Sequence, residues 1–586
     1  MSEAQAAAWP AMSIAQAHAL LTAPGQPLEI ETVNIAGRPT RTWKNTPPSL
    51  RAVVAMSRAH GERIFLVHED ERVSFEAFHR AVATFAQDLS AHGVVKGDRV
   101  AIVMRNLPEW PVAFYAVVSL GAIATPLNAW WTAQELQYAL TNSGAKVAIF
   151  DAERAARVAE QLGACPELER IYIARGGEAA IPDPHVVRLE SVIGAPQDWS
   201  GLDDVPLPVT PIDPDDPATL LYTSGTTGAP KGALGTHRGV NTNILTSACA
   251  SARVFLRRGE IPPATTDDTA QRSMLMSVPF FHVTGCVAFL NPTLAAGGKL
   301  VMMRRWDPVR AFELIARERI QTAGGVPTIA WQLIEHPARA DYDLSSLEAV
   351  IYGGAPAAPE LVRKIRETFP GSQPGIGWGM TETSGTVTSN SAEDYLNRPD
   401  SCGPPAAVAD LKIVDPADPS RELAVGEVGE LLAFGPMVVS GYWNRPEATA
   451  SGFIDGWVRT GDLARLDEDG FCYIIDRAKD MLIRGGENIY CIEVENALYD
   501  HPAVMDAALV GLAHRTLGEE PAAVVALRPG AQASEEDLRA HVAERLAAFK
   551  VPVRVLIATE TLPRNANGKI LKSELKGWFA AEPAAN

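Results

Sequence analysis

The sequence predicts an α/β protein in which a large N-terminal domain, with mainly parallel sheets and a small β-rich subdomain, precedes a small α+β C-terminal domain. Three features of the pattern support this fold class. Apolar strands alternate with amphipathic helices over the first third of the chain, strands joined by turns dominate after Leu411, and the last part combines strands with one clear helix. Alternation of the first kind is typical of parallel sheets covered by helices, whereas strands joined by turns favour antiparallel pairing.

The first well-defined helix follows Ser74, whose hydroxyl can cap its N-terminus. Its apolar side chains recur at helical spacing before Gly93 ends it: Phe75, Phe78, Val82, Phe85 and Leu89. Buried strands are predicted at 99–104, 121–127 and 146–150, separated by helices that end at Leu120 and cover 135–140. Strands with a helix between them are expected to run parallel.

A Pro- and Asp-rich stretch at 203–217 leads into the remaining strands of the large domain. We expect these at 218–222, 273–278, 298–303, 349–354 and 375–379. The β-rich subdomain is predicted from strands at 411–415, 429–434 and 471–476. In the C-terminal domain a helix at 534–549 precedes a strand at 553–557, and the N-terminal stretch is expected to be a loose arm or a short helix.

Composition excludes several classes of protein. The chain has 586 residues, with 52 basic against 70 acidic side chains and a net charge of −18, so we expect no nucleic-acid partner, which would require a basic surface. Its six cysteines are scattered without a C-x-x-C pair, which predicts buried thiols in a reducing cytoplasm. No apolar run approaches the length of about 18 residues that a membrane-spanning helix needs, and the N-terminus lacks the basic start of a signal peptide.

The stretch "YTSGTTGAPKG" (222–232) indicates a loop that binds phosphate. Its glycines let backbone N–H groups approach an anion, and its hydroxyls and lysine add donors and charge: Ser224, Gly225, Thr226, Thr227, Gly228, Lys231 and Gly232. It is not a Walker A loop, because Pro230 precedes the lysine and a glycine follows it. A glycine-rich surface turn is the alternative. Neither H-E-x-x-H nor G-x-S-x-G occurs, and the glycines at 375–379 do not have the dinucleotide spacing.

The chain resembles the adenylate-forming enzymes, which include acyl- and aryl-CoA synthetases, luciferases and peptide-synthetase adenylation domains. Besides the phosphate loop, four segments match in the family's order: "GWGMTE" (377–382), 429–462 with "DGWVRTGD" at its end, "DRAKDMLIRGGENIYCIEVE" (476–495) and "PRNANGKILK" (563–572). The resemblance implies an adenylation domain at 1–476 and a mobile C-terminal domain at 477–586. It also implies a reaction with ATP, Mg²⁺ and coenzyme A, in which a carboxylic acid becomes an acyl-adenylate and then a thioester.

The resemblance assigns roles to individual residues. Lys569 would bridge the carboxylate and the α-phosphate, Thr381 would contact the α-phosphate, and Glu382 would bind Mg²⁺. Asp462, with Arg477 nearby, would bind the ribose, and Trp378 would stack on adenine where the family usually has tyrosine. The phosphates would contact 223–228 and Lys231. Further nucleotide contacts are implied for Gly354, Ala355 and Gly379, and acyl contacts for His282, Gly353 and Gly377, although His282 is almost as well explained as a core histidine.

In the family, the small domain rotates after adenylation. Lys479 stands at the matching hinge position, and Gly486 belongs to the loop that would meet the pantetheine arm. The acid is expected to be hydrophobic, because His282 is the only side chain that can be charged in the segments expected to line the acyl channel. An aryl-CoA ligase, an adenylation enzyme that loads a separate carrier protein, and a non-catalytic acyl- or nucleotide-binding protein are the alternatives.

Overall fold

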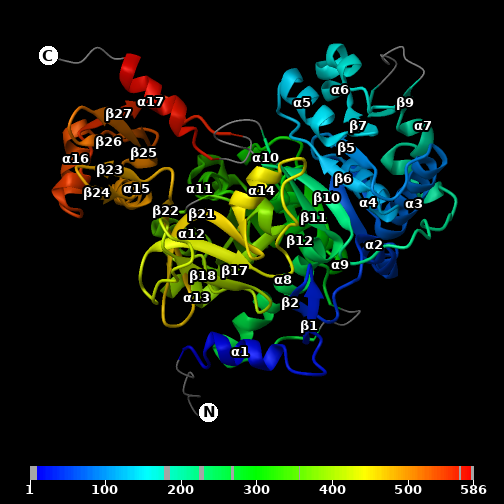
Figure 1. Ribbon diagram of the computed structural model, residues 1–586, viewed down its shortest axis with the longest axis horizontal. Helices are drawn as coiled ribbons and strands as arrows, with labels where there is room; N and C mark the ends of the chain where they lie inside the picture. The colour runs from blue at the N-terminus through cyan, green and yellow to red at the C-terminus, as the bar shows by residue number, and fades with distance from the viewer. Residues whose placement is uncertain are drawn as a thin grey trace.

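A computed structural model describes residues 9–176, 185–223, 230–264, 269–355, 357–565 and 569–581. Two large sheets, a smaller antiparallel sheet and a separate C-terminal sheet organise these residues. Figure 1 shows the C-terminal unit, coloured orange and red, beside the rest of the chain. The predicted fold class is confirmed: a large N-terminal part with mostly parallel sheets precedes a small α+β part.

The first large sheet has the order β11-β10-β6-β5-β7-β8-β9, and only its β10–β11 pair is antiparallel. Its strands are β5 (Arg99–Val103), β6 (Ile123–Pro126), β7 (Val147–Asp151), β8 (Arg170–Ala174), β9 (Val186–Arg188), β10 (Pro217–Tyr222) and β11 (Gly232–Thr236). The β10–β11 hairpin places the predicted phosphate loop at the edge of this sheet.

The second large sheet has the order β17-β16-β15-β14-β12-β13-β3-β4, with antiparallel pairs only at its two edges. Its strands are β3 (Ile64–His68), β4 (Glu71–Ser74), β12 (Ser273–Met276), β13 (Lys299–Met302), β14 (Thr322–Gly325), β15 (Ala349–Gly353), β16 (Gln373–Met380) and β17 (Gly385–Ser391). The "GWGMTE" segment therefore lies at the end of β16.

Helices cover these sheets, as the alternating pattern predicts. Those of the large part are α1 (Ile14–Leu21), α2 (Leu50–Ser57), α3 (Phe75–Ala91), α4 (Glu109–Ser119), α5 (Ala133–Ser143), α6 (Ala152–Val158), α7 (Glu190–Ile193), α8 (His237–Arg258), α9 (Asn291–Ala295), α10 (Pro308–Glu318), α11 (Pro327–Glu335), α12 (Pro359–Thr368), α13 (Ala392–Asn397) and α14 (Pro446–Gly452). Ser74 caps α3 as predicted, since its hydroxyl accepts from the Ala77 N–H at 3.1 Å.

The antiparallel subdomain and the C-terminal unit follow in the chain. The subdomain contains β18 (Asp410–Val414), β19 (Gly429–Phe434), β20 (Phe453–Ile454), β21 (Trp457–Leu466) and β22 (Cys472–Arg477). The C-terminal unit contains β23 (Leu482–Arg484), β24 (Glu487–Ile489), α15 (Cys491–Tyr499), β25 (Val504–His514), β26 (Gly518–Leu527), α16 (Glu535–Ala543), β27 (Arg554–Ala558) and α17 (Lys572–Ala581). A further hairpin of β1 (Ile30–Ile35) and β2 (Arg38–Trp43) follows α1 near the N-terminus, where no strand is predicted.

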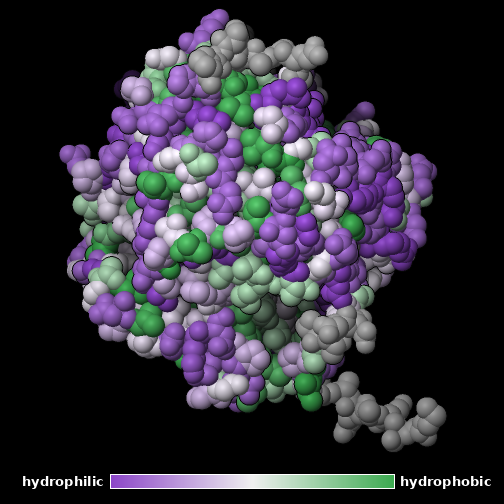
Figure 2. Space-filling model, turned by 90° about the vertical axis from the view of Figure 1, so that its right-hand side faces the viewer, coloured by the Kyte–Doolittle hydropathy of each residue, from purple (hydrophilic) through white to green (hydrophobic). Residues whose placement is uncertain are grey.

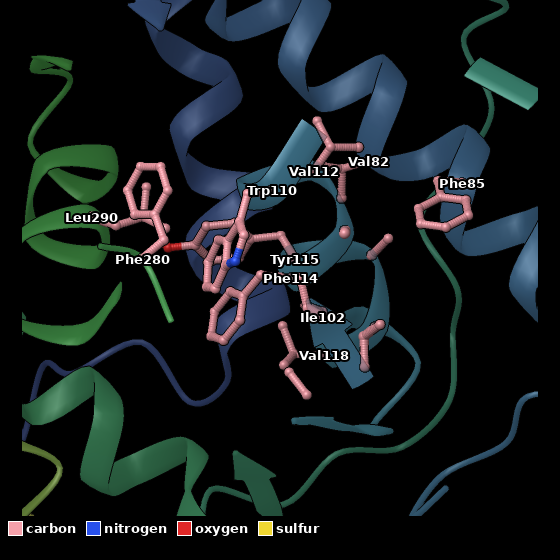
Figure 3. Packing of buried hydrophobic residues seen from close by; sticks show 14 of the residues in the cluster. Val82, Phe85, Ile102, Trp110, Val112, Phe114, Tyr115, Val118, Phe280 and Leu290 are labelled. Atoms are coloured by element: carbon pink, nitrogen blue, oxygen red, sulfur yellow. The ribbon is translucent and has the colours of Figure 1, made fainter. Parts of the chain in front are cut away.

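An aromatic group in the main core joins α4 to the second sheet (Figure 3). Trp110 stacks on Phe114 and on Phe280, with ring centroids 5.4 and 5.1 Å apart. Asn106 adds two hydrogen bonds to the same segment, to the Val278 carbonyl and from the Phe280 N–H, both at 2.9 Å. The segment that leads to His282 is therefore held to α4 and to the residues just before it by a buried aromatic stack and two hydrogen bonds.

The described helices include none that is both long and apolar enough to cross a bilayer. On the face drawn in Figure 2, hydrophilic residues cover most of the surface and hydrophobic residues occur in small scattered groups.

Candidate active site

The phosphate loop begins and ends on one edge hairpin. At its base the Thr223 N–H donates to the Lys231 carbonyl at 2.8 Å, so the two ends of the loop are joined directly. A Cβ atom at Gly232 would lie 2.8 Å from the Leu220 Cδ1 methyl group and 3.3 Å from the Tyr222 ring, so a larger residue there would have to displace these side chains. Five predicted phosphate-binding residues lie outside the described residues: Ser224, Gly225, Thr226, Thr227 and Gly228. Their contacts to phosphate stay a prediction.

Tyr442 connects the phosphate loop to the predicted metal ligand. The Lys231 ammonium lies 4.9 Å from the centroid of the Tyr442 ring, and the Tyr442 hydroxyl donates to Glu382 Oε1 at 2.6 Å. Burial and the neighbouring Glu382 carboxylate raise the pKa of Tyr442 well above its usual value, so its hydroxyl keeps the proton that it donates. Tyr442 lies within the matched segment 429–462, but the sequence motifs do not single out this residue.

Glu382 lies in a short turn that follows β16, beside Thr381. Glu382 is buried, with 7 % of its surface exposed, and its backbone carbonyl accepts a hydrogen bond from the Val439 N–H at 3.0 Å. Among the described residues no group of three or more His, Cys, Asp or Glu side chains could hold a metal ion by itself. A single buried carboxylate nevertheless fits Mg²⁺, because this ion is usually bound through one or two carboxylates together with substrate phosphates.

Asp462 is the centre of a buried polar group. It is 4 % exposed, and the register of β21 and β22 pairs it with Arg477. Arg477 Nε lies 2.7 Å from Asp462 Oδ1, and the indole N–H of Trp378 donates to Asp462 Oδ2 at 2.9 Å. The structure thus brings together three residues predicted to bind the nucleoside. The bond from Trp378 was not predicted, and the stacking of its ring on adenine stays a prediction.

Lys569 reaches this group from the C-terminal unit. Its backbone closes a turn with Asn565, whose Oδ1 accepts from the Lys569 N–H at 3.0 Å. Burial, with the nearby cations of Arg477 and Lys479, lowers the pKa of Lys569 to about 8, although the carboxylates of Asp462 and Glu382 act in the opposite direction. The Lys569 ammonium is therefore within electrostatic range of the predicted nucleotide and metal ligands.

The lowered pKa of Lys569 predicts a pH dependence of adenylate formation. Only the ammonium form can stabilise a developing phosphate charge, and it predominates below a pKa of about 8. We therefore expect kcat/KM for ATP in pyrophosphate exchange, which reports the free enzyme, to fall as pH rises through about 8. The Lys569→Arg variant is the matched control, since its guanidinium stays charged. If kcat/KM of that variant also fell at this pH, a group other than Lys569 would be responsible for the pH dependence.

Glycines line the edge where β15, β16 and β17 meet. A Cβ atom at Gly353 would lie 2.5 Å from the Gly377 carbonyl oxygen, and one at Gly379 would lie 1.8 Å from the Gly385 carbonyl oxygen. Close backbone packing therefore requires glycine at these two predicted site positions. Gly354 differs, because it has a φ of +76° and faces open space. It and Ala355 follow the end of β15 next to Gly377, near the predicted nucleotide segment.

His282 follows the segment that contains Val278 and Phe280, which packs on Trp110 through Phe280. Its Nδ1 lies 3.1 Å from Thr284 Oγ1 and 3.3 Å from the Thr284 backbone nitrogen. Burial, and then the neighbouring Lys569 ammonium, lower the pKa of His282 to about 4, so the imidazole is neutral at pH 7. Its proximity to Lys569 places it beside the predicted reacting groups, whereas contact with an acyl group stays a prediction.

The predicted hinge lies on a turn between β22 and β23. Lys479 occupies this turn, and burial lowers its pKa. The preceding Asp476 is 1 % exposed and accepts hydrogen bonds from the N–H groups of Arg477 and Cys491. Gly486 lies beyond the hinge, at the tip of the β23–β24 hairpin, and faces open space.

Comparison with known proteins identifies the class. A family model described as AMP-binding enzyme matches residues 53–443, and the model of the AMP-binding enzyme C-terminal domain matches residues 493–569. The chain belongs to the AMP-binding enzyme family. The predicted resemblance is thereby confirmed.

Individual relatives agree with this family. The chain is 34% identical over 512 residues to feruloyl-CoA synthase of Amycolatopsis sp, covering 87% of this chain and 95% of that protein. It is 33% identical over 522 residues to the long-chain-fatty-acid–CoA ligase FadD13 of Mycobacterium tuberculosis, covering 87% and 94%. The structure of o-succinylbenzoate CoA synthetase (MenE) of Bacillus subtilis in complex with its acyl-adenylate intermediate matches with a TM-score of 0.73 and 29% identity, over 90% of this chain and 98% of that one.

These findings confirm the predicted enzyme class, an AMP-forming acid–thiol ligase of the acyl- and aryl-CoA ligase type. Enzymes of this class use ATP and coenzyme A, as predicted.

Proposed function

We propose that this protein is an ATP-dependent CoA ligase that activates a hydrophobic carboxylic acid through an acyl-adenylate. One observation carries the proposal: Trp378, Asp462 and Arg477 meet in a buried polar group, and the charges of Asp462, Arg477 and Glu382 act on Lys569, which comes from the C-terminal unit. A binding protein would not need a lysine, a carboxylate at the predicted metal position and a buried carboxylate at the predicted ribose position to converge in this way.

The first half-reaction joins a carboxylate to the α-phosphate of ATP and releases pyrophosphate. Both reactants are anions, so the site must supply positive charge and fixed hydrogen-bond donors where charge develops. Lys569 and Thr381 would act at the α-phosphate, while Lys231 and the loop from Thr223 would bind the outer phosphates. Asp462 would accept from the ribose hydroxyls, and Arg477 would hold its carboxylate in place, since the two are paired at 2.7 Å.

Glu382 would bind Mg²⁺ together with the phosphates, and the ion would neutralise part of their charge. The hydrogen bond from Tyr442 fixes the Glu382 carboxylate before ATP arrives. Because Tyr442 also lies against Lys231, it would keep the metal ligand and the phosphate-binding cation at a constant separation.

For the second half-reaction, we propose that the C-terminal unit, from β23 onward, rotates against the rest of the chain about Lys479. The rotation would withdraw Lys569 and bring Gly486 towards the thiol of coenzyme A. The thiol sulfur then attacks the acyl carbon, AMP leaves from it, and the thiol proton is released. The turn between β22 and β23 supports this boundary, because the two strands belong to different sheets.

A hydrophobic acid is supported by the neutral character of the predicted acyl segments. Within "SVPFFHVTGCVAF" (277–289), "IYGGAPAAP" (351–359) and "GIGWG" (375–379), His282 is the only side chain that can be charged, and its pKa of about 4 keeps it neutral at pH 7. A substrate ammonium buried there would lack a carboxylate partner, which is very costly. A second substrate carboxylate would likewise lack a cation.

The substrate proposal predicts the outcome of an acid panel. We expect kcat/KM to rise with chain length over straight-chain acids of two to eighteen carbons, by about 0.8 kcal/mol for each well-buried methylene until the pocket is full. AMP release is measured in a coupled assay for every acid, and the panel also includes benzoate, cinnamate and an amino acid. A preference for acetate or the amino acid would refute the apolar pocket.

An aryl-CoA ligase is the second candidate, and the similarity to feruloyl-CoA synthase favours it. A preference for cinnamate in the same panel would select this branch. Pyrophosphate exchange without thioester formation would instead indicate an enzyme that loads a carrier protein, and the absence of exchange with every acid would indicate a binding protein.

A further inference from the structure

We propose that Arg528 forms a latch with Glu335 and Trp331 that holds the C-terminal unit in the orientation that forms the adenylate. The inference rests on the proposed function in one respect, namely that the unit rotates between the two half-reactions. Neither Arg528 nor its two partners belong to the nucleotide site described above.

Arg528 is fixed rigidly to the C-terminal unit. It follows the last residue of β26, its backbone N–H donates to the Ala503 carbonyl at 2.9 Å, and its own carbonyl accepts from the Ala531 N–H at 3.0 Å. Its side chain leaves this unit and reaches α11 of the large part. The guanidinium carbon lies 5.3 Å from the centroid of the Trp331 ring, and the guanidinium is ion-paired with Glu335.

The receiving surface on α11 is equally well anchored. Trp331 is 8 % exposed and packs into the core of the second large sheet, and Glu335 is the last residue of the helix. The unpaired carbonyls at a helix C-terminus favour a cation, so they add to the attraction of the carboxylate. About a quarter of each charged side chain is exposed, 24% for Arg528 and 23% for Glu335, so solvent weakens the pair without cancelling it.

An electrostatic interaction of the opposite sign also acts between the two parts of the chain. Burial, and then the Glu360 carboxylate of α12, raise the pKa of Asp500, which follows α15 in the C-terminal unit. The repulsion between these two carboxylates opposes the present orientation of the C-terminal unit, although Arg545 and His541 act on Asp500 in the other direction, while the latch favours that orientation. This opposition is what a device with two accessible orientations requires, because neither orientation is then strongly preferred.

The latch would act on domain orientation and not on the reacting atoms, which makes Arg528 a positioning residue. A partly exposed ion pair with a cation–π contact is worth about a fivefold change in an equilibrium constant. We therefore expect Arg528→Ala to move the equilibrium about fivefold towards the rotated orientation. The ratio of the pyrophosphate-exchange rate to the rate of thioester formation from supplied acyl-adenylate should fall accordingly.

The direct test measures the distance between the two units in the enzyme without substrates. All six native cysteines are buried, so spin labels can be placed selectively on Asp343→Cys and Glu544→Cys, two exposed positions with 64% and 74% of their side chains accessible. Pulsed electron–electron double resonance measures the distribution of distances between the two labels. The population at the distance of the rotated orientation should be larger in Arg528→Ala than in the parent. Charge reversal by Arg528→Glu should do the same, and adding Glu335→Arg should restore the parent distribution.

Asp500→Asn is the matched control, because removing the opposing charge should move the populations the other way. Unchanged distances in both Arg528 variants, or no recovery in the exchanged pair, would overturn the latch. The distance measurement does not depend on turnover. If the protein activates no acid but shows these shifts, the proposed function is refuted and the latch is supported. If the enzyme is active and the distances are unchanged, the proposed function is supported and the latch is refuted.

Discussion

Replacing Lys569 by alanine should abolish adenylate formation and leave thioester formation from supplied acyl-adenylate largely intact. The charges of Asp462, Glu382 and Arg477 act on this side chain, and in the proposed mechanism negative charge develops on the α-phosphate only in the first half-reaction. Loss of one such contact costs on the order of 10²–10³ in rate. Pyrophosphate exchange measures the first half, and CoA-dependent release of AMP from the supplied adenylate measures the second.

Lys576→Ala is the matched control for this prediction. Lys576 belongs to the adjacent helix α17, its side chain is 49% exposed, and its ammonium lies 3.9 Å from a Glu519 carboxylate oxygen. Both half-reactions should stay close to the parent rates in that variant. If Lys569→Ala retained most of its exchange activity, the assigned role of Lys569 would be wrong, and an equal loss in both half-reactions would indicate a damaged fold.

Local signals were sufficient for much of the fold. The Ser74 cap and the apolar stripe of α3 lie within one helix, and each step of that pattern is set by residues three or four apart. The hairpin of β1 and β2 was not predicted because its turn consists of Ala36 and Gly37, both at positive φ, and alanine gives no signal for such a turn.

The site was predictable as a list of residues but not as a set of contacts. The motifs identify Trp378 and Asp462 separately, yet their hydrogen bond joins strands of two different sheets. Two further contacts, between Tyr442 and Glu382 and between Arg528 and Glu335, likewise join segments that are far apart in the chain. Such contacts depend on how complete sheets and units pack, which periodicity within one segment cannot reveal.

Replacing Gly486 by tryptophan should have the opposite effect from Lys569→Ala, sparing pyrophosphate exchange and slowing transfer to coenzyme A. In the present orientation no atom lies within 4 Å of a Cβ built on Gly486, so this position opens into free space rather than onto the nucleotide site. After the proposed rotation the indole would occupy the path of the pantetheine arm. Misplacing the thiol by about 1 Å already costs on the order of a hundredfold in rate.

The control for this substitution follows from the geometry of the turn. Gly485 and Gly486 form a two-residue hairpin loop between Arg484 and Glu487, with φ values of +61° and +93°. This is the conformation of a type I′ turn, in which asparagine is tolerated and bulky residues are strained. Gly486→Asn should therefore keep the hairpin and most of the thioester activity. If Gly486→Asn lost as much activity as Gly486→Trp, the cause would be the turn; if Gly486→Trp formed the thioester at the parent rate, the rotation would not bring this loop to the thiol.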